Sequence, residues 1–103
     1  MIVLSRLQNL LKAASIWILD TEGDVIATSQ GVTEVPAKVA EHHAWFMTRP
    51  SHAESTLTLR DASTKYILSE LNSEMVVVVV GDERLVFSQA GFYIKELADK
   101  LVP

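Results

Sequence analysis

The run Met75–Val80 (M-V-V-V-V-V) restricts the fold of this chain more than any other segment. Five consecutive valines favour an extended strand, because β-branched side chains fit a pleated surface. Successive side chains of a strand point to opposite faces, so this strand is apolar on both. Such a strand belongs in the interior of a sheet that is covered on both faces. The run is far shorter than the roughly 20 residues needed to cross a bilayer, and we expect no membrane span.

Four further segments have the composition of strands. Ser15–Asp20 is apolar on both faces and leads through an acidic turn containing Gly23 into Val25–Thr28, which predicts a β-hairpin. Glu54–Arg60 alternates threonine with leucine, the period-two pattern of a half-buried strand. Lys65–Leu71 is the fourth predicted strand, which makes Met75–Val80 the fifth.

Three segments have helical periodicity. The first, residues 2–14, has one apolar face, formed by Val3, Leu4, Leu7, Leu10, Leu11 and Ala14. The second is expected to begin at Thr33 as N-cap, with Pro36 in its first turn, and to end before Arg49. The third covers residues 84–101, where Gly91 on the apolar side indicates close packing of the helix on the sheet.

The order of these elements, α, β-β, α, β-β-β, α, defines an α+β fold. Hairpin-length connections favour an antiparallel sheet, and the two strands that are apolar on both faces belong side by side in its interior. The predicted strand order is therefore 2-1-5-4-3. We expect a three-layer α-β-α sandwich, with one helix on one face of the sheet and two on the other. A chain of 103 residues has room for a single domain, residues 1–103.

Composition excludes several classes of function. The net charge of -4 and the absence of a basic cluster disfavour nucleic-acid binding. The chain has no cysteine, which excludes thiol catalysis and thiolate metal sites. No motif typical of an enzyme or of a cofactor site is present, so we expect no catalytic residue and no cofactor. Without a secretory segment, the expected compartment is the cytoplasm.

The three histidines, His42, His43 and His52, do not have the spacing of metal ligands. Adjacent helical residues point about 100° apart, and no H-x-x-x-H pair occurs. We expect His42 to pack near the apolar stripe of the second helix and His43 to lie at its margin. A role in pH sensing at a dimer interface is the alternative, because imidazole titrates near neutrality.

Acidic residues gather in the first hairpin turn. Asp20, Glu22 and Asp24 lack the length, the glycine position and the terminal glutamate of a calcium loop, so a solvated turn is the simpler interpretation. In the strand order 2-1-5-4-3, Glu74 lies at the same end of the sheet. The four carboxylates then form an acidic rim suited to steering a basic partner.

Two features suggest an interface. The third strand is a predicted edge without proline or an inward charge to protect it, which favours pairing with another chain. Trp45 lies beside Lys38 and Glu41 at the margin of the second helix's apolar stripe, so full burial in a monomer is not expected. Either it belongs to an interface or it is a partly buried boundary residue. The predicted interface comprises Lys38, Glu41, Trp45, Ser55, Thr56, Leu57, Thr58 and Leu59.

The layout resembles the roadblock family, the dynein light chain type of domain related to profilin-like and longin folds. The resemblance covers almost the whole chain. It is carried by L-S-R-L-Q-N-L-L-K-A-A running directly into S-I-W-I-L-D-T-E-G-D-V-I-A, by the second helix, and by M-V-V-V-V-V-G-D before a closing helix. Asp20 and Gly23 of the first turn are its most family-like detail.

Membership of this family would imply a dimer, with a second copy or a paralogous chain. Third strands would pair edge to edge into a ten-stranded sheet, and second helices would pack together. It would also imply a non-enzymatic regulator or scaffold for a small Ras-like GTPase or a motor complex. The alternative is a small-molecule sensor of PAS-like or longin-like type, with a pocket lined by Trp17, His42, His43 and Phe46.

Overall fold

Eight helices and strands make up the computed structural model, which describes residues 2–29, 34–48, 56–71 and 74–101. In chain order they are α1 (Ile2–Leu11), β1 (Ala13–Asp20), β2 (Val25–Thr28), α2 (Ala37–Met47), β3 (Thr56–Asp61), β4 (Thr64–Glu70), β5 (Met75–Gly81) and α3 (Phe87–Leu101).

The five strands form one sheet in the order β2-β1-β5-β4-β3, and every neighbouring pair is antiparallel. Strand order and direction therefore confirm the prediction. The two strands that are apolar on both faces lie side by side, with Trp17 opposite Val78 and Ile18 opposite Val77. Both are covered from the two sides of the sheet, which explains why neither shows a polar face.

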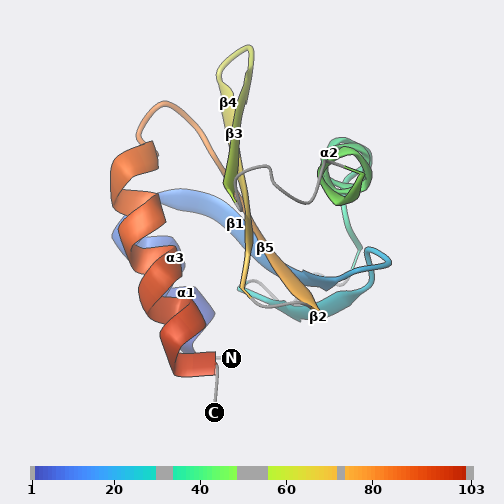
Figure 1. Ribbon diagram of the computed structural model, residues 1–103. Coiled ribbons are helices and arrows are strands. Elements are labelled where there is room, and N and C mark those ends of the chain that lie inside the picture. The colour runs from blue at the N-terminus through green and yellow to red at the C-terminus, as the bar shows by residue number, and fades with distance from the viewer. Residues whose placement is uncertain (1, 30–33, 49–55, 72–73, 102–103) are drawn as a thin grey trace.

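Helices cover both faces of the sheet, α1 and α3 on one and α2 on the other (Figure 1). Alternate side chains of each strand divide accordingly into two hydrophobic clusters. The cluster under α1 and α3 includes Leu4, Leu7, Leu11, Ile16, Ile18, Ile67, Val77, Val79, Ala90 and Ile94. The cluster under α2 comprises Trp17, Leu19, Val39, Phe46, Tyr66, Leu68, Val76 and Val78.

The first helix ends earlier than its periodicity predicts. It stops at Leu11, and Lys12 adopts the left-handed conformation (φ 56°) that usually falls to glycine at a helix end. Ala14, predicted on the apolar helical face, lies instead in β1. Leu10, predicted on the same face, is 47% exposed. The chain thus turns directly from helix into strand with a single residue between them.

The other boundaries shift by a few residues. Pro36 is the N-cap of α2 rather than part of its first turn, and the predicted cap Thr33 lies outside the described residues. The helix α3 begins at Phe87, not at residue 84. Before it, the backbone N–H of Leu85 donates to the carbonyl of Asp82 (3.1 Å), and the Asp82 carboxylate accepts the N–H of Arg84 (2.9 Å). These bonds form a turn that delays the helix.

The prediction for Gly91 is wrong. This residue is exposed on α3, and a Cβ atom added there would meet nothing within 4 Å. Close packing on the sheet occurs instead at Ala90, which is fully buried. Because adjacent helical residues point about 100° apart, the buried stripe passes beside Gly91.

We expect Gly91→Ala to stabilise the protein. Alanine removes the backbone entropy cost of a glycine in a helix, about 0.5–1 kcal/mol, and nothing opposes its methyl group. Thermal unfolding followed by circular dichroism should show a midpoint about 4 °C higher. Gly81→Ala is the matched contrast, because its Cβ would approach the Cβ of Leu85 to 3.1 Å. A midpoint that is unchanged or lower in Gly91→Ala would contradict the exposed position of this residue.

Candidate interaction surface

The strand β3 is an edge of the sheet and pairs with β4 alone among the described strands. Its six residues pair without a register shift, from Thr56 opposite Ser69 to Asp61 opposite Thr64. Leu57 and Leu59 are half-buried and pack against the cluster under α2. Their alternation with exposed threonines confirms the period-two pattern. Among the described strands, β3 has no partner on its outer side, and a strand edge with a regular register pairs readily with another chain.

One flank of α2 lies on the same side of the molecule as β3. The Nζ atom of Lys38 is 3.5 Å from Oδ2 of Asp61 at the end of β3. The ring of His42 packs edge-on against Tyr66 of β4, with 4.7 Å between centroids. Trp45 follows these residues by seven and three positions, about two turns and one turn of the helix, and therefore lies on the same flank.

Trp45 is 60% exposed, the most exposed of the large apolar side chains on this flank. We call the edge of β3 and this flank the β3–α2 surface, defined by Leu57, Leu59, Lys38, His42 and Trp45. An exposed tryptophan beside an unpaired strand edge combines a side chain enriched in interfaces with backbone groups available for pairing.

The second edge of the sheet, β2, is protected. It has only four residues, and its pairing with β1 contains a register shift between Ile18 and Leu19. Short edge strands and bulges are two devices that prevent edge-to-edge pairing. Of the two edges, β3 is therefore the one suited to pairing.

Seven of the eight predicted interface residues lie in the described part of the chain, where five are exposed and Leu57 and Leu59 are half-buried. The five exposed residues are Lys38, Glu41 and Trp45 of α2 and Thr56 and Thr58 of β3. Ser55 lies outside the described residues. Their role in pairing stays a prediction. Asp61 was not among the interface residues predicted from the sequence, because its contact with Lys38 depends on where α2 crosses the sheet.

The expected roles of the two neighbouring histidines are reversed. His43 is buried, 4% exposed, and its Nε2 atom donates to the backbone carbonyl of Asp20 (3.0 Å). Its Nδ1 atom lies 3.5 Å from where a Cβ of Gly23 would stand, and Gly23 has a positive φ of 92°. His42 is only half-buried, although its Nε2 atom is covered and has no hydrogen-bond partner in the described part of the chain. His43 thus ties α2 to the first hairpin turn.

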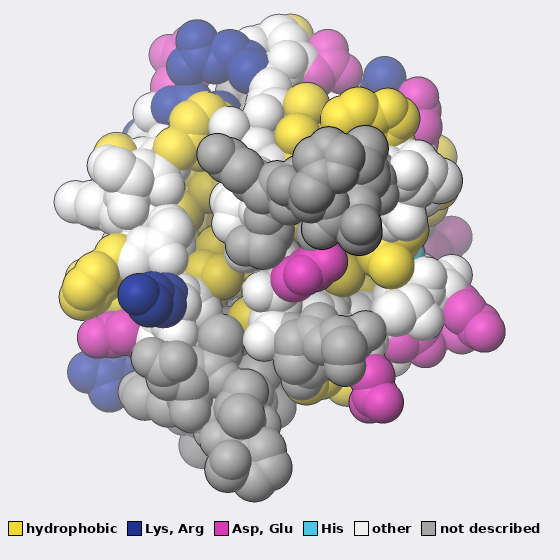
Figure 2. Space-filling view, in the orientation of Figure 1, with side chains coloured by type: hydrophobic (Ala, Val, Ile, Leu, Met, Phe, Trp, Pro, Cys, Tyr) yellow, Lys and Arg dark blue, Asp and Glu magenta, His cyan; other side chains and the backbone are white. Residues whose placement is uncertain are grey.

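The acidic rim has one residue with a local structural role. The Asp20 carboxylate accepts the backbone N–H groups of Glu22 and Asp24, both at 2.9 Å, which closes the turn. Asp20 stands opposite Met75 in the β1–β5 ladder, so Glu74 does lie at the same end of the sheet. Acidic side chains are visible at the side of the molecule where Figure 1 places the tip of this hairpin (Figure 2). Whether they steer a partner stays a prediction.

Three of the four residues proposed to line a sensor pocket, Trp17, His43 and Phe46, are buried, and His42 is half-buried. Trp17 and Phe46 are buried in the hydrophobic cluster under α2, and His43 is engaged with the hairpin turn. The indole Nε1 of Trp17 is buried without a hydrogen-bond partner in the described part of the chain. Packing of this kind does not favour a ligand pocket at these residues.

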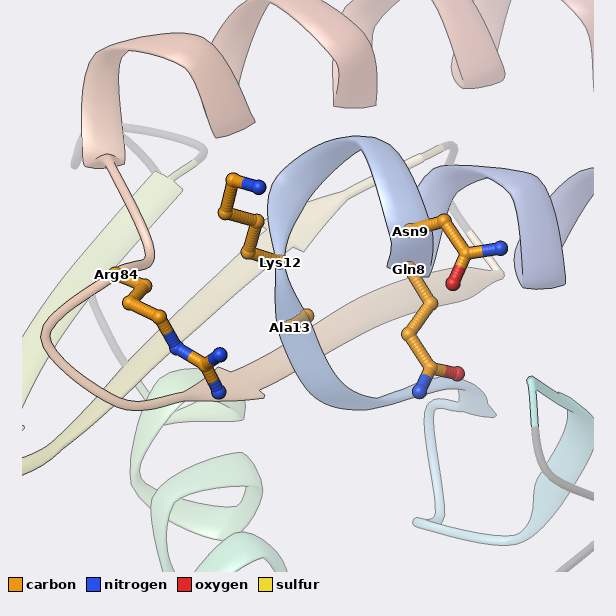
Figure 3. A pocket seen from close by; sticks show the side chains of 5 residues that line it. All are labelled: Gln8, Asn9, Lys12, Ala13 and Arg84. Carbon is orange, nitrogen blue, oxygen red and sulfur yellow. The ribbon is translucent and has the colours of Figure 1, made fainter.

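An open hollow of about 390 Å³ lies instead at the C-terminal end of α1, lined by Gln8, Asn9, Lys12, Ala13 and Arg84. The side chains of Lys12 and Arg84 extend in different directions (Figure 3). Arg84 is paired with Asp82, its Nη2 atom lying 3.0 Å from Oδ2, and this contact lowers the pKa of the Asp82 carboxyl. The two cations therefore do not converge on one ligand position.

No group of three or more potential metal ligands occurs among residues 2–29, 34–48, 56–71 and 74–101. In those same segments no helix has the length and apolar character needed to cross a membrane.

Neither a protein-family model nor a curated protein sequence matches this chain. Several solved structures do match it. MglB of Myxococcus xanthus superposes with a TM-score of 0.80 at 17% identity, over 97% of this chain and 89% of that one. A Roadblock/LC7 domain from Streptomyces avermitilis superposes with a TM-score of 0.77 at 16% identity, over 96% and 94%. Profilin IA of Acanthamoeba castellanii follows at 0.60 and 21%, over 96% and 95%.

The chain therefore has the roadblock fold, as its sequence layout suggested. The similarity to MglB and to the Roadblock/LC7 domain covers nearly the whole chain and nearly the whole of each of those structures. At 16–17% identity it concerns the fold.

Proposed function

We propose that this protein is a non-enzymatic interaction module of the roadblock type, which pairs through the β3–α2 surface with a second roadblock domain. The observation that carries the proposal is the unprotected edge of β3 beside the exposed Trp45. Pairing would satisfy the free backbone groups of the edge and remove the indole from water. Both changes favour association.

The geometry of the surface supports a partner with a strand edge of its own. Leu57 and Leu59 are half-buried at the rim of the cluster under α2, so an added strand would extend that hydrophobic layer beyond the molecule. The other edge, β2, offers neither the length nor the regular register for this. One continuous ten-stranded sheet, joined through β3, is the expected assembly.

The roadblock resemblance further implies that the paired domains regulate or anchor a small Ras-like GTPase in the cytoplasm. The surface around the paired second helices is the proposed docking site, and the acidic rim of Asp20, Glu22, Asp24 and Glu74 is the proposed steering charge. One of the similar structures is described as MglB with tetrameric arrangement, which supports assembly with other chains as a role for a protein of this fold.

Light scattering across a dilution series tests the pairing. We expect a mass of twice 11.4 kDa that persists on dilution. In the single chain, β3 has no outer partner among the described strands and Trp45 is exposed to water. A mass of 11.4 kDa at every concentration would contradict self-pairing and direct the search to a paralogous partner.

Binding of a GTPase is tested on the same sample by isothermal titration calorimetry. Ras-like GTPases of the same genome are titrated, loaded with GDP or with a non-hydrolysable GTP analogue.

A further inference from the structure

We propose that the side of β3 that faces α3 is a docking site for an acidic segment of a partner protein. The site, here called the basic strip, is formed by Thr58 and Arg60 of β3, Lys65 of β4, and Gly91 and Lys95 of α3. It lies on the face of the sheet opposite to the β3–α2 surface and does not require pairing through that surface. It therefore adds a second interaction surface to the proposed function.

Two cations stand directly opposite each other on neighbouring strands. Arg60 pairs with Lys65 in the β3–β4 ladder, and opposite residues project from the same face of a sheet. That face is the one toward α3, because the Nζ atom of Lys65 donates to the carbonyl of Leu85 (2.9 Å) and lies 5.3 Å from the centroid of the Phe87 ring. Like charges directly opposite each other destabilise a sheet. The hairpin would therefore be more stable with a carboxylate at position 60.

No carboxylate compensates these two charges in the described part of the chain. The neighbouring Asp61 faces α2, where its Oδ2 atom lies 3.5 Å from Nζ of Lys38. Neither Arg60 nor Lys65 has an ion pair with a described residue. In a fold whose other features agree with one another, a side-chain choice that costs stability is expected at a functional site. The uncompensated pair of cations points to an anion supplied by another molecule.

A third cation extends the site along α3. Lys95 is exposed and follows Gly91 by four positions, so both lie on one flank of the helix. The half-buried Tyr93 lies on the opposite flank and packs against the cluster under α1 and α3. Because α1 contacts β1, α3 contacts β4 and β3 lies beyond β4, the open flank is the one toward β3. Lys95 therefore belongs to the same strip as Arg60.

The strip is open to another molecule along its length. Thr58 and Arg60 are exposed, so the described helices leave this face of β3 uncovered. A Cβ atom at Gly91 would meet nothing within 4 Å, which leaves room beside the helix for another chain. The β3–β4 hairpin projects beyond the helices, so the end of the strip that carries Arg60 is accessible (Figure 1).

The spacing of the cations favours an extended acidic chain over a compact anion. Lys95 is eight residues beyond Phe87, the contact of Lys65, which corresponds to about 12 Å along the helix axis. Alternate side chains of an extended segment are about 7 Å apart, so its carboxylates can meet a row of cations. Arginine also binds a carboxylate through two parallel hydrogen bonds.

Nucleic acid is the less suitable polyanion. Its closely spaced phosphates are held by many more cations than the strip contains, and the chain as a whole has a net charge of -4. A short acidic peptide needs only the few charges that the strip offers.

Fluorescence anisotropy of fluorescein-labelled octaglutamate tests the site. The titration is made in about 0.1 M salt, where a Debye length of about 10 Å screens the acidic rim at the other end of the sheet. Arg60→Glu should weaken binding by about ten-fold or more, because it replaces a bidentate partner by a repelling charge. Lys95→Gln should weaken it by about three-fold. Arg6→Glu is the matched control, since it reverses an exposed arginine on α1 and should leave the affinity within about two-fold.

Thermal unfolding of the same variants separates binding from a structural role. Arg60→Glu places a carboxylate opposite Lys65, so it should raise the unfolding midpoint by about 2–4 °C while it lowers the affinity for the peptide. A side chain that only stabilised the hairpin would change stability and binding in the same direction. Light scattering on each sample shows whether a variant changes mass, which keeps this test separate from pairing through the β3–α2 surface.

Peptide binding that falls in Arg60→Glu and persists in Arg6→Glu, with a raised midpoint in Arg60→Glu, supports the proposal. Equal losses in the two variants would show that net charge attracts the peptide and would overturn the assigned site. An unchanged or lower midpoint in Arg60→Glu would overturn the repulsion from which the site is inferred. Octathymidylate that binds more tightly than octaglutamate would overturn the choice of partner. Unchanged anisotropy at about 1 mM protein would overturn the site itself.

Discussion

Trp45→Ala is expected to weaken self-association by at least about 30-fold. Truncating an interface hot spot costs about 2 kcal/mol or more, and every 1.4 kcal/mol is a factor of ten in the dissociation constant. A two-fold symmetric dimer contains two copies of the side chain, so the effect approaches 1000-fold (about 4 kcal/mol) if each copy contributes independently. The dissociation constant is measured by sedimentation equilibrium over a range of concentrations.

Phe92→Ala is the matched control for this experiment. Phe92 is an aromatic residue with nearly the same exposure, 61% against 60%, but it lies on α3, on the other face of the sheet. It should leave the dissociation constant within about two-fold of the unmodified value, as expected of a surface side chain outside the interface. Circular dichroism confirms that both variants are folded. Equal dissociation constants for Trp45→Ala and Phe92→Ala would show that the β3–α2 surface is not the interface.

His43→Ala is expected to lower the free energy of unfolding by about 3 kcal/mol. The imidazole is buried, so its removal leaves a cavity beneath α2, a change that costs 2–5 kcal/mol for large side chains. The hydrogen bond from Nε2 to the Asp20 carbonyl is lost as well, and with it the link between α2 and the first hairpin turn. Denaturant unfolding followed by circular dichroism or tryptophan fluorescence measures the change.

Two further substitutions separate the volume of His43 from its hydrogen bond. His43→Leu keeps most of the volume and loses the donor, so a cost of about 1–2 kcal/mol is expected. His43→Gln places an amide N–H near the position of Nε2 and should recover part of that loss. His42→Leu is the neighbouring control and should change stability little, because the Nε2 atom of His42 has no hydrogen-bond partner in the described segments. A larger loss in His42→Leu than in His43→Leu would contradict the assigned roles.

Residue periodicity predicted most of the secondary structure and the topology. Valines on both faces of Met75–Val80 and the apolar run in β1 require an interior position with helices on each side, and short connections require antiparallel neighbours. These are local constraints with few solutions. The errors in predicted helix boundaries lie where periodicity carries no information. Lys12, for example, ends α1 in a left-handed conformation that its residue type does not indicate.

The sequence by itself determined the sheet order, the two-sided core and the presence of an unprotected edge strand, because each follows from which faces of an element are apolar. Only the tertiary structure decided how α2 crosses the sheet. The stripe of Val39 and Phe46 is compatible with either histidine facing inward, and the crossing direction is set by packing against strands distant in sequence. That direction buries His43 against the hairpin turn, brings Lys38 to Asp61, and leaves Trp45 exposed beside β3.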